Sequence, residues 1–291
     1  MSGAIALDRA WLAAHPLPVP SDDETKNSRG RVLSIGGSRT VPGALRLTGE
    51  AALRVGAGKV RLATIESAAL SMGLLLPEAA VIGLPENGDG EIASLASAAL
   101  DTIARVDTVL VGPGMTSRDA ARRLVAAVAA SLPDDAVLIL DAAGVACAGP
   151  LLDRLRPLAG RLILTPHLGE MAALCECAET EVAAAPERIV VETAGRFGAA
   201  LLLKGPHTLV ASPDGVLVDY PGGGVGLATS GSGDVLAGAI AGLAARGAPI
   251  MDAAAWGVWL HGEAGRAVAA RQARIGFLAR DLLPELPGLL P

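Results

Sequence analysis

Hydrophobic residues along this chain fall into short, dense runs from residue 31 onward, and alanine-rich stretches separate these runs. Most runs are apolar at consecutive positions, which is typical of strands buried on both faces of a sheet. Strand-like runs that alternate with helix-compatible stretches indicate βαβ units and a largely parallel sheet. The pattern therefore predicts an α/β fold, a central mostly parallel sheet flanked by helices on both faces. The predicted strands of its parallel part are Arg31–Ile35, Lys59–Ala63, Ala79–Ile82, Thr108–Val111, Ala136–Leu140, Arg161–Leu164 and Ala199–Leu203.

Two later runs predict that the sheet gains antiparallel strands near its end. Thr208–Ala211 and Val216–Tyr220 are strand-like, and the residues between them read Ser-Pro-Asp-Gly. Proline and glycine stand there where a tight turn favours them. We therefore expect these two strands to form a hairpin.

No linker is long enough to divide the chain, so residues 30–291 are expected to form a single domain. Residues 1–29 contain three prolines and the polar stretch Ser21–Arg29, which predicts an N-terminal arm or irregular lead-in before the first strand. Gly222–Gly224 is too short to be a linker and precedes another helix-compatible stretch. It is interpreted as a loop.

The composition adds detail to the expected core. Hydrophobic residues make up 51% of the chain but aromatic residues only 2%, so small aliphatic side chains must fill the space between layers. This favours strands sandwiched between closely packed, alanine-rich helices. The formal net charge of -6 argues against a nucleic-acid-binding face, which needs a basic surface to neutralise phosphates.

Targeting and redox features favour the cytoplasm. The three cysteines are an odd number without the spacing of a disulfide framework, so they are expected to be reduced. Asp8, Arg9 and His15 interrupt the N-terminal segment, and a signal peptide is not expected there. No apolar run has the length of a membrane span. We therefore expect a cytoplasmic protein without membrane association.

Glycines and polar residues follow several predicted strands at their carboxyl ends. Ligands of open α/β sheets bind in the crevice beyond those ends, where loops from several strands meet. Each loop alone is more often a simple turn than a site, because turns favour glycine, proline and aspartate. His167 and Lys204 are more informative, since a turn needs neither an imidazole nor an ammonium group, whereas an anionic ligand does. The loops are Gly36–Ser38, Gly112–Gly114, Asp141, Thr165–His167 and Lys204–Gly205.

The segment Gly231–Asp234 is the sharpest local signal of a binding site. It reads Gly-Ser-Gly-Asp and opens an apolar, helix-compatible stretch, and the N–H groups and positive dipole of a helix N-terminus attract anions. Asp234 falls in the first turn of that helix. With an ordinary pKa of about 3.9 it is ionised at neutral pH, which makes it a candidate general base for phosphoryl transfer. The alternative is that its charge merely stabilises the helix.

Other motifs of nucleotide, metal and hydrolase chemistry are absent or incomplete. Gly56–Lys59 resembles part of a P-loop but lacks the first glycine and the metal-binding hydroxyl of that motif. No G-x-G-x-x-G follows a strand and no G-x-S-x-G occurs, which argues against a simple dinucleotide dehydrogenase and an α/β-hydrolase. Cys175 and Cys177 lack a second ligand pair at zinc spacing and are interpreted as packing or exposed thiols. His261 is interpreted as an ordinary helix histidine.

Several segments, taken in order, resemble one family, the NAD(P)H-hydrate dehydratases, whose fold is ribokinase-like. No single segment is sufficient, but together they cover most of residues 30–270 in the order and spacing of the family. The most specific is Gly226–Gly242. The other matching segments are Gly30–Gly37, Gly43–Gly58, Val111–Met115, Leu138–Asp141, Leu164–Met171 and Leu202–Thr208.

The resemblance implies an enzyme that repairs damaged nicotinamide cofactors. In that reaction ADP or ATP, with Mg²⁺, phosphorylates the ring hydroxyl of the S-epimer of NAD(P)H hydrate, and loss of phosphate restores NAD(P)H and leaves AMP or ADP. The resemblance makes Asp234 the base, and it identifies no metal ligands. It places at the anion hole and nucleotide site Gly231, Ser232, Gly233, Lys204, Gly205, Pro206, His207 and Thr208. It places against the hydrated cofactor Ala44, Gly114, His167 and Asp234.

The resemblance also implies partners. Some bacterial relatives carry the dehydratase behind an epimerase domain, and this chain has no room for that domain. A separate NAD(P)H-hydrate epimerase is therefore the expected partner. A homo-oligomer is expected too, and the resemblance is consistent with a tetramer.

The chain departs from the family pattern at chemically relevant positions. The usual Leu-Asp-Ala-Asp after the central strand ends here in Ala143, so one carboxylate is missing. Gly224 stands where asparagine is usual, and Ser230 where glycine is common. Ser232 replaces a threonine but keeps the hydroxyl. The lost carboxylate and amide put metal geometry, substrate choice and activity in question.

Two other functions stay open at this point. A ribokinase-like kinase of a small alcohol, such as a vitamin precursor, would share the fold, the anion hole and Asp234. The Thr-Pro-His-x-Gly-Glu loop around His167, together with Gly112–Gly114, favours the dehydratase. A catalytically idle nucleotide-binding protein is the second alternative, because Ala143 and Gly224 carry no reactive side chain.

Overall fold

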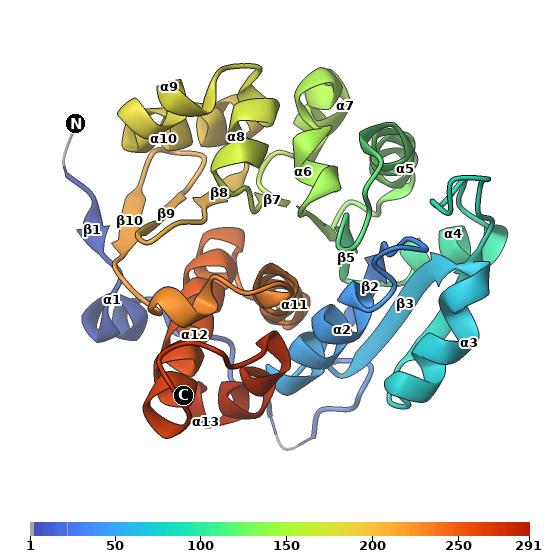
Figure 1. Cartoon of the computed structure of the whole chain (residues 1–291), viewed down its shortest axis with the longest axis horizontal. Coiled ribbons are helices and arrows are strands. Elements are labelled where there is room, and N and C mark those ends of the chain that lie inside the picture. Colours follow the sequence, from blue (N-terminus) through green and yellow to red (C-terminus); the bar gives the residue numbers. More distant parts are fainter. Residues whose placement is uncertain (1–2, 22) are drawn as a thin grey trace.

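One ten-stranded sheet runs through the part of the chain that the computed structural model describes, residues 3–21 and 23–291. The strand order is β1-β10-β9-β8-β7-β6-β5-β2-β3-β4 (Figure 1). Neighbouring strands are parallel, except that β9 is antiparallel to both β8 and β10. The strands are β1 Ile5–Ala6, β2 Arg31–Ile35, β3 Lys59–Ile65, β4 Ala80–Leu84, β5 Thr108–Val111, β6 Val137–Leu140, β7 Leu162–Leu164, β8 Ala200–Leu203, β9 Thr208–Ala211 and β10 Leu217–Tyr220.

Helices cover both faces of the sheet, as the consecutive apolar positions predicted. Successive residues of β2 show why, because Val32 packs into the core on one face and Leu33 into the core on the other. The layer that includes α11 and α12 consists of α1 Arg9–Ala14, α2 Ala44–Arg54, α3 Glu66–Leu75, α11 Ser232–Ala245, α12 Ile250–Arg271 and α13 Leu286–Leu289. The opposite layer consists of α4 Ser97–Ile103, α5 Arg118–Ser131, α6 Ala143–Ala146, α7 Leu152–Leu155, α8 Leu168–Cys175, α9 Glu179–Ala184 and α10 Pro186–Phe197. None of these described helices is both long and apolar enough to cross a membrane.

All nine predicted strands are present, with ends that differ by at most two residues. The predicted α/β architecture and the antiparallel hairpin of β9 and β10 are therefore confirmed. Short 3₁₀ helices complete the connections at Gly149–Leu151, Arg156–Leu158, Val225–Leu227, Ala279–Asp281 and Leu283–Glu285.

Part of the N-terminal arm is folded into β1 and α1, so the interpretation as an irregular lead-in was wrong for residues 5–14, whereas the described residues 15–21 and 23–29 are irregular. Strand β1 pairs in parallel with β10, and α1 buries Trp11 and Leu12 against the core on the side of α12. The Asp8 carboxylate caps α1 by accepting from two backbone N–H groups. These elements of two and six residues are too short to show a strand or helix period in the sequence. The division of the chain at residue 30 stays a prediction.

The strand order reverses between β2 and β5, which creates the crevice where open α/β sheets bind ligands. The loops that follow these two strands touch each other, because the Gly37 N–H donates to the Pro113 carbonyl at 2.7 Å. Glycine at position 36 is required for this approach, since a Cβ atom there would lie 2.1 Å from the same carbonyl oxygen. The chain therefore forms its crevice where the sequence has glycine after both strands.

Helix α11 is held in place by very close packing against α2. A Cβ atom on Gly238 would lie 2.3 Å from the Thr48 carbonyl oxygen, and one on Gly242 would lie 2.6 Å from the Ala52 carbonyl oxygen. The helix also packs on β2, β5 and β6. Figure 1 shows α11 near the middle of the molecule, between α2 and α12. This position brings its N-terminus to the carboxyl ends of the strands.

Candidate active site

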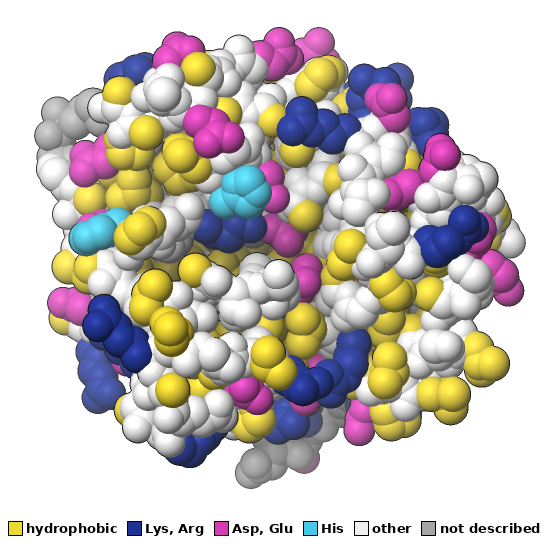
Figure 2. All heavy atoms as spheres, viewed as in Figure 1, with side chains coloured by type: hydrophobic (Ala, Val, Ile, Leu, Met, Phe, Trp, Pro, Cys, Tyr) yellow, Lys and Arg dark blue, Asp and Glu magenta, His cyan; other side chains and the backbone are white. Residues whose placement is uncertain are grey.

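The loops at the carboxyl ends of the strands enclose a cavity of about 840 Å³. Figure 2 shows a hollow near the middle of the visible face, with histidine, basic and acidic side chains at its edge. Its lining combines polar side chains such as Lys204 and Ser232 with apolar ones such as Leu227 and Val258. The size and mixed lining suit a nucleotide-sized ligand. The lining residues are His167, Lys204, Gly205, Pro206, Thr208, Tyr220, Pro221, Gly222, Gly224, Val225, Leu227, Ala228, Thr229, Ser232, Gly233, Leu236, Val258, His261 and Gly262.

The structure brings together most residues that the sequence assigned to the nucleotide. On the cavity wall lie Lys204, Gly205, Pro206, Thr208, Ser232 and Gly233. Gly231 lies just behind them as the N-cap residue of α11. The side chain of His207 does not join the wall, because it is 66% exposed and its Nδ1 atom lies 3.0 Å from Asp219 Oδ2. A role for His207 in nucleotide binding stays a prediction.

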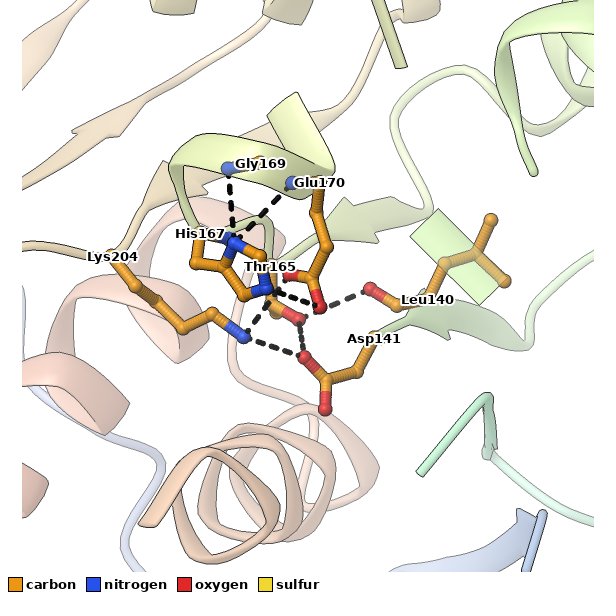
Figure 3. Close-up of polar contacts among 7 residues, drawn as sticks. All are labelled: Leu140, Asp141, Thr165, His167, Gly169, Glu170 and Lys204. Carbon is orange, nitrogen blue, oxygen red and sulfur yellow. Dashed lines mark hydrogen bonds and ion pairs between the residues drawn. The ribbon is translucent and has the colours of Figure 1, made fainter. Parts of the chain in front are cut away.

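The Lys204 ammonium group lies in the cavity wall between two carboxylates. Its Nζ atom lies 2.9 Å from Asp141 Oδ1 and 3.6 Å from Glu170 Oε2 (Figure 3). Thr165 Oγ1 donates to the same Asp141 oxygen at 2.6 Å, which fixes the carboxylate. Burial alone would lower the pKa of Lys204, but the charges of Asp141 and Glu170 outweigh it, so the pKa lies above its usual value. Lys204 is therefore a fixed cation at the carboxyl end of β8.

The N-terminus of α11, which was predicted to bind an anion, lies beside this cation. Gly231 caps the helix in the left-handed region with φ 86°, and no side chain caps it, so the N–H groups of the first turn stay available to a ligand. A Cβ atom on Gly233 would lie 3.6 Å from Lys204 Nζ. The helix N-terminus and the ammonium group therefore face the same small volume, where an anion would meet both.

Asp234 lies in the first turn of α11 and has a strongly perturbed pKa. Burial raises the pKa to about 7, the Asp141 carboxylate adds to the rise, and the Lys204 ammonium opposes it. The expectation of an ordinary aspartate pKa was therefore wrong, because the sequence does not show how much water the carboxylate loses. A carboxylate that titrates near neutral pH is well suited to general base catalysis.

His167 closes one side of this cluster and also starts α8. Its Nδ1 atom accepts from the backbone N–H groups of Gly169 at 3.0 Å and Glu170 at 3.3 Å (Figure 3). The Glu170 carboxylate in turn accepts from the His167 N–H at 2.8 Å, which completes a capping box. Because Nδ1 accepts, the neutral ring carries its proton on Nε2, 3.2 Å from Glu170 Oε1. The Thr-Pro-His-x-Gly-Glu loop thus serves as a helix start as well as a cavity wall.

Ala44 and Gly114 lie together at the crevice between β2 and β5, outside the lining of the main cavity. A Cβ atom on Gly114 would lie 2.8 Å from the Ala44 Cβ atom, and Ala44 begins α2. The N-terminus of α11 packs against α2 beside this crevice, since a Cβ atom on Gly231 would lie 2.6 Å from Leu47 Cδ1 and 3.8 Å from Asp234 Oδ2. Asp234 itself is not among the residues that line the cavity.

Three further side chains lie at the site, although the sequence analysis assigned them no specific role there. They are Asp141, Glu170 and His261. Asp141 follows β6 directly and Glu170 completes the Thr-Pro-His-x-Gly-Glu loop, so a local signal existed for both. The Nε2 atom of His261 lies 2.8 Å from Ser232 Oγ. No sequence pattern connects these two residues, because the contact depends on how α12 packs against α11.

The two departures from the family pattern have different surroundings. Gly224 lines the cavity with a φ of 85° and a ψ of 164°, a conformation that is essentially restricted to glycine. Ala143 opens the short helix α6, two residues after Asp141. The carboxylate that is missing at position 143 thus leaves Asp141 as the acidic group of this loop that pairs with Lys204.

A magnesium ion at this site would depend mainly on phosphate oxygens. Across residues 3–21 and 23–291, no group of three or more His, Cys, Asp or Glu side chains is arranged to hold a metal ion. Asp141 and Asp234 are close enough for one charge to shift the pKa of the other. Mg²⁺ in nucleotide sites typically takes one or two carboxylates together with phosphates and water. The residues present fit that mode of binding.

Solved structures define the class of fold. A ribokinase-like superfamily protein from Enterococcus faecalis matches with a TM-score of 0.84 and 25% identity, over 99% of this chain and 95% of that chain. An ADP/ATP-dependent NAD(P)H-hydrate dehydratase from Bacillus subtilis, co-crystallised with ATP and Mg²⁺, matches with a TM-score of 0.79 and 26% identity, over 99% and 98% of the two chains. The protein is therefore a ribokinase-like α/β protein, as predicted.

Sequence relatives narrow this class to one family. The family model for NAD(P)H-hydrate dehydratases matches residues 32–288. An ADP-dependent (S)-NAD(P)H-hydrate dehydratase from Xanthomonas campestris is 48% identical over 97% of this chain and 94% of the relative. A bifunctional NAD(P)H-hydrate repair enzyme from Moorella thermoacetica is 37% identical over 98% of this chain but 53% of the relative. The chain belongs to the NAD(P)H-hydrate dehydratase family.

Proposed function

We propose that this protein uses ADP, or ATP, to dehydrate the S-epimer of NAD(P)H hydrate and so restores NAD(P)H. The observation that carries the proposal is the position of Asp234, a carboxylate with a pKa of about 7 on an uncapped helix N-terminus. It follows Ser232 and Gly233, which line the nucleotide-sized cavity, on a helix whose N-terminus packs against α2 near the crevice at Ala44 and Gly114. This is the arrangement needed to join a phosphoryl donor to a hydroxyl acceptor.

We propose one orientation of the nucleotide in the cavity. The lining residues Tyr220, Leu227 and Val258 favour the base, because burial of these side chains against an aromatic ring removes apolar surface from water. The phosphates then extend to Lys204 and the first turn of α11. There, charge-assisted hydrogen bonds from the ammonium and backbone N–H groups stabilise them. Mg²⁺, held by the phosphates with Asp141 and Asp234, would supply further neutralisation of phosphate charge.

Asp234 activates the acceptor in the proposed reaction. Its carboxylate takes the proton from the ring hydroxyl of the hydrate while that oxygen forms a bond to the terminal phosphorus of the nucleotide. The bond from phosphorus to the bridging oxygen breaks, and AMP leaves when ADP is the donor. The phosphorylated ring then loses phosphate from one carbon and a proton from the neighbouring carbon, which restores the double bond of NAD(P)H. Lys204 and the N–H groups of α11 stabilise the charge on the transferred group.

The proposed reaction also implies a partner enzyme. Several relatives join this domain to a second activity, since the chain spans about half of the bifunctional repair enzymes. We propose that an NAD(P)H-hydrate epimerase acts with this protein and supplies the S-epimer. Assembly into a homo-oligomer, with a tetramer as one form, and a cytoplasmic location stay predictions.

Recovery of reduced nicotinamide tests the proposal directly. Purified protein is incubated with enzymatically prepared NADH hydrate, Mg²⁺ and either ADP or ATP, and the absorbance band of reduced nicotinamide is followed. We expect the band to return only when nucleotide is present. Nucleotide binding without recovery would support the idle alternative. Phosphorylation of a small alcohol without recovery would support the kinase alternative, although the dehydratase relatives, which match nearly the whole chain, favour the first reading.

A further inference from the structure

His261 contacts the Gly-Ser-Gly-Asp loop and lines the same cavity. It lies in the middle of α12, and its Nε2 atom is 2.8 Å from Ser232 Oγ. Ser232 is the first residue of α11, is only 5% exposed, and lines the cavity beside Gly233. The packing of α12 on α11 thus places an imidazole against the one hydroxyl of the Gly-Ser-Gly-Asp loop. This contact has no role in the mechanism described so far.

The ring of His261 is neutral at physiological pH. Burial lowers its pKa to about 4, the hydrogen bond with the Ser232 backbone opposes this fall, and the Lys204 charge adds to it. A neutral imidazole has one proton, on Nδ1 or on Nε2. The nitrogen that faces Ser232 Oγ, at 2.8 Å, is Nε2.

The two tautomers direct the Ser232 hydroxyl in opposite ways. If the proton were on Nδ1, the bare Nε2 would accept the hydroxyl proton and turn it away from the cavity. With the proton on Nε2, the ring donates to Oγ, and the hydroxyl proton is free to point into the cavity. There it joins the N–H groups of Gly233 and Asp234 in the first turn of α11. The tautomer therefore decides whether the anion site has a hydroxyl donor.

We infer that His261 is a positioning residue, whose Nε2–H donates to Ser232 Oγ and thereby aims the serine hydroxyl at the phosphoryl group that is transferred. This inference rests on the proposed function, because it assigns the loop to the phosphates of the nucleotide. His261 itself does not touch the phosphate. The inference explains why a polar ring stands on the inner side of α12, where its neighbours Val258 and Leu260 are apolar and buried.

Kinetics of Ser232→Ala, His261→Ala and the double variant test the coupling. Each single variant should lower kcat for ADP-driven dehydration about tenfold with a smaller change in KM, because a hydrogen bond to developing charge is lost. The double variant should be no slower than the slower single variant, since both changes remove the same interaction. His261→Gln, which keeps an N–H donor near the position of Nε2, should recover part of the loss.

His15→Ala is the matched control. His15 is another partly buried histidine that contacts α12, through Asp252 at 3.1 Å, but it does not line the cavity. This variant should leave kcat unchanged even if it lowers the melting temperature. A loss of kcat equal to that of His261→Ala would mean that any disturbance of α12 impairs the enzyme, and it would overturn the specific role of His261.

Nitrogen NMR of protein labelled with ¹⁵N-histidine tests the tautomer without turnover. The chain has four histidines, and the spectrum of His261→Ala, or of His261→Gln if the alanine variant does not fold, assigns the signal. We expect a protonated Nε2 both without ligand and with ADP. A proton on Nδ1, or additive losses in the double variant, would refute the inference. If the wild type binds ADP but never restores NADH, the proposed function fails, and the NMR result still decides the hydrogen bond.

Discussion

The folded protein strongly changes the pKa of the Asp234 side chain. In water its pKa would be near 3.8, and in the structure it is about 7, chiefly because of burial and then because of the Asp141 charge. Below neutral pH much of the proposed base is therefore protonated. We infer that kcat/KM rises as the pH increases towards about 7 and then levels, since only the ionised carboxylate accepts a proton.

Asp234→Asn should separate catalysis from stability. Turnover should fall about 10²-fold or more, because the amide cannot act as a base. The melting temperature near pH 7 should rise. The folded state binds the proton more tightly than the unfolded chain, so ionisation between pH 4 and 7 destabilises the fold, and a neutral amide avoids that cost. The difference in melting temperature should shrink as the pH falls towards 4. Activity assays and thermal melts over this range measure both effects.

Asp119→Asn is the matched control for that experiment. Asp119 also lies in the first turn of a helix, α5, but its side chain is 72% exposed. The Asp119→Asn variant should lose about 0.3–1 kcal/mol of its free energy of unfolding, because the amide no longer interacts favourably with the helix dipole. It should keep full activity. A fully active Asp234→Asn enzyme that is destabilised like Asp119→Asn would reduce Asp234 to a helix-stabilising residue.

At the scale of elements, the contact between α2 and α11 determines where the anion site lies. Gly238→Ala should be destabilising by about 1–3 kcal/mol, because its Cβ atom would overlap the Thr48 carbonyl at 2.3 Å and the helices would have to separate. Thermal or urea unfolding measures the loss. Activity should fall as well, since the first turn of α11 would move relative to Lys204.

Gly73→Ala in α3 provides the contrast for this prediction. The nearest atom to a Cβ at that position is Val81 Cγ2 at 3.7 Å, an ordinary contact. The substitution should therefore stabilise the protein by up to about 1 kcal/mol, because alanine loses less backbone freedom in a helix than glycine. Destabilisation by both substitutions to the same extent would show that the close packing of α11 is not the cause.

At the scale of the whole molecule, binding of a nucleotide should raise the free energy of unfolding. ADP with Mg²⁺ should raise the melting temperature, since a ligand that binds only the folded state adds about 2.7 kcal/mol at a hundredfold excess over its Kd. Lys204→Met should abolish most of this shift. It should also lower the melting temperature without ligand, because Asp141 and Glu170 would lose their buried counter-charge.

Lys59→Met is the control for the loss of a lysine. Lys59 begins β3, at the opposite end of the strands from the site. The nucleotide-induced shift should stay at its wild-type size in this variant. If no adenine nucleotide changes the melting temperature of the wild type at saturating concentration, the assignment of the cavity to a nucleotide is wrong.

The sequence by itself determined the layers of this protein and the identity of its main chemical groups. Runs of consecutive apolar residues required strands covered on both faces, and glycine or polar residues after them marked the edge where ligands bind. The Gly-Ser-Gly-Asp segment indicated an anion site, because free N–H groups at a helix start depend only on local chain geometry. Short elements such as β1 were not predictable, since two residues have no measurable period.

Only the tertiary structure decided how these groups act on one another. The pKa of Asp234 depends on its burial in the folded protein and on Asp141, which lies 93 positions away in the sequence. The link between His261 and Ser232 depends on the packing of two helices, and His207 turned away from the cavity to pair with Asp219. Local sequence patterns show which chemical groups the chain carries. Solvent exclusion and distances between side chains arise only when distant segments pack together, and these set charge, proton position and therefore chemistry.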